Sequence, residues 1–95
     1  MTIDITTITQ HANNMVRAQE TENYMKKYGN GTIVIYQIGD YYKAYGESAD
    51  RLTEIMKELP LIENGISTYE FKKSYQDILF PRIISKGYKI AVLES

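Results

Sequence analysis

One short segment constrains the fold more than any other part of this chain. Residues 32–38 read TIVIYQI, and their β-branched side chains favour a strand. Because successive side chains of a strand point to opposite faces, both faces of this segment are apolar. Such a strand belongs in the middle of a sheet and not at its rim.

The residues that follow predict a hairpin. Gly39-Asp40 is a turn dipeptide, and residues 41–45 (YYKAY) have the pattern of a returning strand. Side-chain alternation then puts Tyr41, Lys43 and Tyr45 on one face of that strand. We therefore expect the hairpin tip to present the ring of Tyr41 to solvent.

Two helices are expected on either side of this hairpin. The first covers Thr9 to Tyr28, and the glycines that follow it supply a stop. The second runs from Ser48, a plausible N-cap, to about Glu58, because Pro60 disfavours helical backbone just before it. Its apolar residues recur at helical spacing and predict one buried stripe: Ala49, Leu52, Ile55, Met56 and Leu59.

A third helix and a last strand are expected near the end of the sequence. The helix begins at about Asp77, which places Pro81 near its opening turn, where a missing N–H is tolerated. Gly87 is a natural stop for this helix. Residues 88–93 (YKIAVL) then predict the strand.

A second hairpin completes the pattern, with residues 61–63 and 66–71 on either side of an Asn64-Gly65 turn. The elements therefore alternate as helix, hairpin, helix, hairpin, helix, strand. This order predicts an α/β (α+β) fold: a mixed sheet of about five strands flanked by about three helices. We expect one compact domain overall, with residues 1–31 as an N-terminal helical arm and 32–95 as the α/β domain.

Composition excludes several classes of protein. A chain of 95 residues with 43% hydrophobic and 24% charged residues is long enough for one globular core. Eleven basic residues against twelve acidic ones predict no strong indiscriminate affinity for nucleic acid or anionic membranes. The absence of cysteine excludes disulfides and thiolate metal sites. No apolar run is long enough to span a membrane, so we expect a cytoplasmic protein. We also expect no metal or cofactor, because a chain of this size has no room for a large cofactor cleft and its single histidine has no partner for a metal site.

Three stretches, read together, resemble one protein family. Residues 33–45 (IVIYQIGDYYKAY) are similar to the strand–Gly-Asp–strand signature in the N-terminal domain of the DNA mismatch-repair protein MutS. Residues 77–86 (DILFPRIISK) are similar to the last helix of that domain, and residues 87–94 (GYKIAVLE) to the strand after it. The stretches lie in the family's order, and the resemblance covers about residues 20–95. It implies the fold of the MutS mismatch-recognition domain.

The resemblance also implies a site. In that family the Phe of a Phe-x-Glu pair wedges into the base stack beside a mispair, and the Glu hydrogen-bonds a base. The Phe position falls on Tyr41 and the Glu position on Lys43. Tyr41 would then be the wedge and Lys43, which can only donate, a charged support. We expect double-stranded DNA binding that tolerates different structures and depends strongly on salt.

Basic residues accumulate toward the end of the sequence. Residues 66–95 carry five basic side chains against three acidic ones. Lys72, Lys73 and Arg82 are therefore candidate phosphate contacts that would support Tyr41 and Lys43. The plainer interpretations are a solvated charged face for these basic residues and a ring packed on a neighbouring helix for Tyr41.

Two other functions remain open at this point. The fold could serve as a non-enzymatic protein-interaction module, or as a homo-oligomer, that has lost DNA binding; the base at position 43 favours this alternative. A weaker alternative is a metal-dependent nuclease built on Glu70-Phe71-Lys72, with Asp50 or Glu63 as the further acid. Because the sequence contains no GxxxxGK[ST] motif, we expect no ATPase. His11 is the only histidine and has no candidate catalytic partner, and we expect no enzymatic activity.

Overall fold

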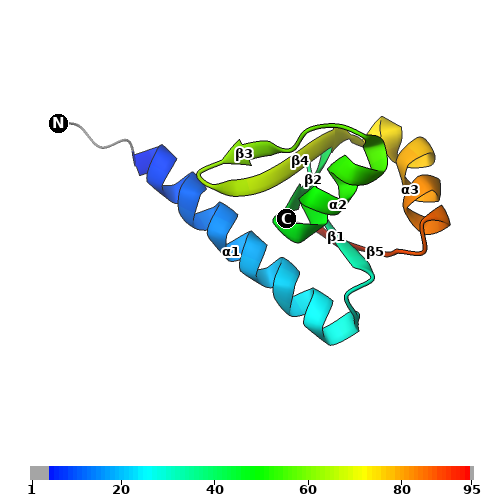
Figure 1. Ribbon diagram of the computed structural model, residues 1–95. Coiled ribbons are helices and arrows are strands. Elements are labelled where there is room, and N and C mark those ends of the chain that lie inside the picture. Colours follow the sequence, from blue (N-terminus) through cyan, green and yellow to red (C-terminus); the bar gives the residue numbers. More distant parts are fainter. Residues whose placement is uncertain (1–4, 95) are drawn as a thin grey trace.

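The computed structural model shows a five-stranded mixed sheet with helices on both faces (Figure 1). It describes the backbone of residues 5–94 and the side chains of residues 14–94. The elements are α1 (Ile5–Tyr28), β1 (Thr32–Ile38), β2 (Tyr41–Tyr45), α2 (Glu47–Met56), β3 (Leu61–Glu63), β4 (Ile66–Lys72), a short 3-10 helix (Lys73–Tyr75), α3 (Gln76–Ser85) and β5 (Lys89–Glu94). The expected α+β fold is confirmed.

Strand β1 lies inside the sheet, as its two apolar faces predict. The strand order is β3-β4-β2-β1-β5, with β1 antiparallel to β2 and parallel to β5. Three successive residues of β1, Ile33, Val34 and Ile35, have no exposed surface at all. Neighbouring side chains of one strand can all be buried only when both faces of the sheet are covered.

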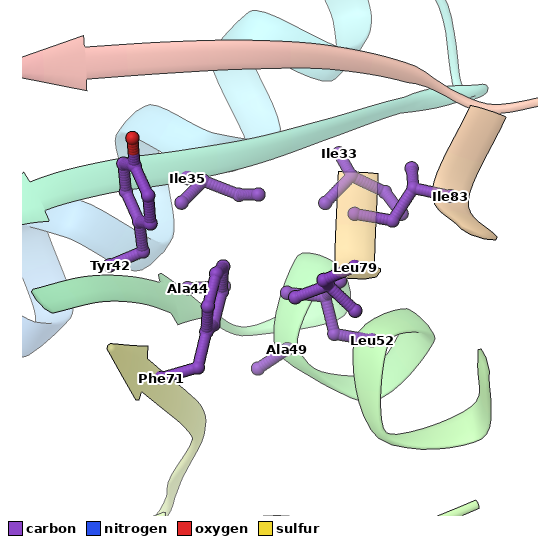
Figure 2. Close-up of a cluster of buried hydrophobic side chains, with 9 residues drawn as sticks. All are labelled: Ile33, Ile35, Tyr42, Ala44, Ala49, Leu52, Phe71, Leu79 and Ile83. Atoms are coloured by element: carbon purple, nitrogen blue, oxygen red, sulfur yellow. The ribbon is translucent and has the colours of Figure 1, made fainter. Parts of the chain in front are cut away.

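Helices α2 and α3 cover one face of the sheet. Figure 2 shows side chains from three strands meeting those of the two helices in one cluster. Its nine buried members are Ile33, Ile35, Tyr42, Ala44, Ala49, Leu52, Phe71, Leu79 and Ile83. Burial on this scale, at about 25 cal/mol per Å² of apolar surface, supplies the main stabilisation of a domain of this size.

Helix α1 covers the other face and contributes a second, smaller cluster. Tyr36, Tyr45 and Val34 are buried there, and Ala18 of α1 packs against them. The guanidinium of Arg17 lies 4.7 Å from the ring centre of Tyr36. The Tyr36 hydroxyl donates a hydrogen bond to the Glu20 carboxylate. Burial, and then this hydrogen bond, raise the pKa of Tyr36 above its ordinary value.

The start of α2 differs from the expectation that Ser48 caps it. The N-cap is Gly46, with a positive φ of 62°, and it makes no side-chain capping bond. Ser48 is fully buried inside the helix, and its hydroxyl accepts a hydrogen bond from the Val34 main-chain N–H at 3.0 Å. The side chain therefore joins α2 to β1 and satisfies a buried donor of the central strand.

The end of α2 also differs from the expectation. The helix ends at Met56, where Lys57 adopts a left-handed conformation with φ 55°. The periodic stripe therefore stops before Leu59, and the predicted burial of Leu59 is wrong, since 92% of its surface is exposed.

Helix α3 begins one residue before the expected Asp77, and Pro81 lies inside it. Within residues 5–94, no helix is long and apolar enough to cross a membrane.

Replacing Ser48 by alanine tests the bond between α2 and β1. Ser48→Ala leaves the buried Val34 N–H without its acceptor, and we expect the free energy of unfolding to fall by about 1–3 kcal/mol. Urea denaturation measures this change. Ser85→Ala is the matched control, because the Ser85 hydroxyl is exposed, and it should change stability by less than about 0.5 kcal/mol. Equal stability of both variants would contradict the assigned role.

Candidate nucleic-acid interface

The candidate interface lies at the tip of the β1–β2 hairpin. Gly39 and Asp40 form a two-residue turn, and Gly39 adopts a left-handed conformation with φ 58°, which glycine takes without steric cost. Ile38 and Tyr41 pair across the turn and are 37% and 41% exposed. An apolar residue and an aromatic ring thus stand side by side at the open end of the sheet.

Two lysines stand beside this tip. Lys72, at the end of β4, pairs directly with Tyr41 of β2. The main-chain N–H of Lys73 donates to the Asp40 carbonyl oxygen at 2.9 Å, which fastens the end of β4 to the turn. A depression of about 400 Å³ lies between them and is lined by Asp40, Tyr41, Lys72, Lys73 and Ser74. The structure therefore brings together three of the five residues that the sequence predicted for the site.

Lys43, the fourth, is occupied by an ion pair. Its Nζ lies 3.0 Å from the Glu63 carboxylate of β3, and the two side chains are only 13% and 23% exposed. The amide of Asn14, from α1, also donates to this carboxylate at 3.3 Å. The ammonium further lies 5.4 Å from the ring centre of Tyr45. Lys43 therefore joins β2 to β3 beneath α1, and its charge is not directed at the hairpin tip.

Arg82, the fifth, lies apart from the others. It is exposed in the last turn of α3, and its guanidinium contacts the Met56 sulfur at 3.9 Å. Helix α3 packs on the face of the sheet opposite the one that bears Tyr41 and Lys43. A contact between Arg82 and the same stretch of DNA stays a prediction, and the hairpin tip does not depend on it.

Sequence reasoning missed two contributors to the tip. Ile38 was not among the residues predicted for the site, and Asp40 contributes through its carbonyl oxygen, which accepts the bond from Lys73. The two-residue turn could have shown that Ile38 lies beside Tyr41 at the tip, because such a turn pairs the residues on either side of it. The bond between Asp40 and Lys73 depends on how two hairpins align, for which the sequence carries no local signal.

The acids considered for a nuclease do not converge. Glu70 lies on β4 directly opposite Lys43, and Glu63 binds the Lys43 ammonium. Asp50 belongs to α2, which packs on the other face of the sheet. Among the side chains of residues 14–94, there is no group of three acids or histidines placed to hold a metal ion.

The fold agrees with a comparison against protein families. The family described as MutS domain I matches residues 18–95. The chain belongs to the MutS domain I family. No protein in a search of the curated proteins matches the chain.

Membership in the MutS domain I family gives the tip its context. MutS domain I is the N-terminal mismatch-recognition domain of MutS, so this chain has the fold of a mismatch-recognition module. The match begins at Ala18, one of the α1 residues that pack on the sheet. Tyr41, to which the sequence resemblance assigns the wedge, is exposed, whereas Lys43, to which it assigns the place of the acid, binds Glu63. The Tyr41 side chain is therefore accessible to a ligand, and the Lys43 ammonium is not.

Breaking the ion pair tests whether Lys43 has a structural role. Lys43→Met leaves the Glu63 carboxylate partly buried without its cation, and we expect a loss of about 1–3 kcal/mol in unfolding free energy. Changing both residues, as Lys43→Met with Glu63→Met, should recover most of that loss because no buried charge remains. Urea denaturation of the native protein and the variants measures both effects. Lys26→Met, at an exposed lysine of α1, is the control, and a similar small effect in all variants would contradict this role.

Proposed function

We propose that this protein binds double-stranded DNA through the β1–β2 hairpin tip and inserts the ring of Tyr41 between bases where the duplex is weakened. The observation that carries this proposal is the 41% exposed Tyr41 ring, with Lys72 opposite it on β4. Stacking on an aromatic ring contributes about 1–3 kcal/mol per base. Unstacking one step costs a few kcal/mol and costs least at a mispair, so insertion selects distorted sites.

Lys72 and Lys73 supply the contacts to the DNA backbone. Among the side chains described, neither forms a salt bridge within the protein, so their charges are available to phosphates. Each phosphate neutralised by a lysine releases counterions, which makes binding weaken steeply as salt rises. The chain's net charge of −1 gives little general attraction to DNA. The electrostatic attraction to the phosphates must therefore come from Lys72 and Lys73.

Lys43 cannot accept a hydrogen bond from a base in the proposed complex. A carboxylate at this position could accept a hydrogen bond from a base, whereas an ammonium held by Glu63 cannot. Recognition then depends on how easily the duplex opens, and not on which bases are mispaired. The role proposed for this chain is binding alone, without a catalytic step.

Fluorescence anisotropy of a labelled duplex tests the proposal. We expect the native protein to bind a duplex with one mispair more tightly than the perfect duplex, and its affinity for different mispairs to follow how easily each one unstacks. Tyr41→Ala should weaken binding about tenfold, because the loss of stacking corresponds to roughly 1.4 kcal/mol, and Tyr41→Phe should keep the native affinity. Tyr28→Ala is the matched control, since Tyr28 is 52% exposed at the far end of α1.

The same assay at several salt concentrations tests the lysines. Lys72→Gln and Lys73→Gln should each lower the slope of log affinity against log salt by about one, with similar effects on all duplexes. No binding at low salt, or equal binding by the native protein and Tyr41→Ala, would contradict the proposal.

A further inference from the structure

A second surface lies along the outer edge of β4. Strand β3 pairs with β4 only from Leu61–Thr68 to Glu63–Ile66. Residues 69–72 of β4 pair with β2 on one side, and within the described residues 5–94 no strand pairs with them on the other side. Residues 69–72 therefore form an unpaired stretch of edge that begins beside Leu61, the first residue of β3.

The main-chain groups at this edge point outward. In an antiparallel strand, the N–H and C=O groups of alternate residues point to the same side. The Ser67 carbonyl oxygen accepts from Gly46, and the Lys73 N–H donates to Asp40, so the odd-numbered residues of β4 face β2. Glu70 and Lys72 therefore direct their N–H and C=O groups away from the sheet, as an added strand requires.

A groove of about 420 Å³ runs along the same edge. Tyr69, Phe71, Ile78, Leu79 and Met56 supply most of its apolar lining. Half of the Ile78 surface, 53%, is exposed. The groove also contains the Glu58 carboxylate, to which the Tyr69 hydroxyl donates a hydrogen bond, and burial together with this bond raises the pKa of Tyr69 to about 12. An apolar groove beside open main-chain groups suits an extended peptide.

We propose that the β4 edge binds an extended segment of a partner protein as an added strand. Side chains of that strand on the α3 face would enter the groove and would be apolar. Those on the other face would lie beside Glu70 and Lys72, where a basic and an acidic residue complement the two charges. In the antiparallel direction the segment thus reads apolar-acidic-apolar-basic-apolar.

DNA is a poor occupant for this groove. Its lining is mostly apolar, and the Glu58 carboxylate beside Tyr69 repels phosphates. The added segment would contact the hairpin tip only at one end of the segment. There, Tyr41 and Lys72 line both the groove and the depression at the tip. The proposal stands on the unpaired edge and does not depend on DNA binding by Tyr41.

A synthetic peptide tests the proposal without DNA. The probe is a fluorescein-labelled, end-blocked peptide, Thr-Val-Glu-Val-Lys-Val-Thr, titrated with the complete protein and followed by anisotropy. In the added strand, the Glu and Lys residues of the probe direct their N–H groups at β4. N-methylation of these two residues should therefore weaken binding at least tenfold. N-methylation of the valines on either side of the Lys, whose N–H groups point away from β4, should weaken it less than threefold.

A pair of protein variants locates the binding. Ile78→Glu puts a charge into the groove and should weaken binding of the unmodified probe at least fivefold. Ile84→Glu is the matched control on the same helix, because Ile84 is 62% exposed and does not line the groove; it should bind like the native protein. Circular dichroism of both variants should match that of the native protein.

Three results would overturn the proposal. The first is no binding of the probe at millimolar protein, and the second is equal binding of both N-methylated forms. The third is a dimer, seen by light scattering, that Ile78→Glu abolishes, because the edge would then belong to a second copy of this chain.

Discussion

The burial of β1 on both faces is the constraint on which the rest of the structure depends. Ile33 and Ile35 require α2 and α3 on one side, whereas Val34 and Tyr36 require α1 on the other. A sheet covered on both faces exposes apolar side chains only at its edges and at the turns between its strands. The hairpin tip with Tyr41 and the unpaired part of the β4 edge are two such places, and β5 with the exposed Val92 lies at the opposite edge. Both proposed binding surfaces therefore follow from the way the core is closed.

The second determinant is a charge reversal inside a family site. A base at position 43 would stand unpaired beneath α1 unless an acid lay near it, and Glu63 supplies that acid from the second hairpin. The pair stabilises the packing of β3 and α1 on the sheet but removes the side chain from recognition. In the proposed binding mode, this domain offers an exposed aromatic ring at the tip and lysines beside it, and it has no carboxylate at position 43 to accept a hydrogen bond from a base.

Local patterns in the sequence were sufficient for the elements, the mixed sheet and the exposed Tyr41. The central position of β1 follows from residues 32–38 alone, and the tip follows from Gly39-Asp40. Predictions failed where distant segments meet. The Ser48 hydroxyl accepts a hydrogen bond from the Val34 main chain instead of capping its own helix. Glu63, the partner of Lys43, lies 20 residues away in the sequence. Helical periodicity could not indicate that α2 ends at Lys57, before Leu59. Lysine is not a residue type that marks a left-handed backbone conformation, so the sequence does not reveal this helix end.

Insertion of Tyr41 is the central claim, and the fluorescence of 2-aminopurine tests it most directly. This base analogue brightens when it is unstacked, so it is placed next to a mispair and measured at saturating protein. The account predicts a marked rise with the native protein and with Tyr41→Phe, and no rise with Tyr41→Ala under conditions where that variant is fully bound. An equal rise with Tyr41→Ala, or none with the native protein, would contradict insertion of the ring.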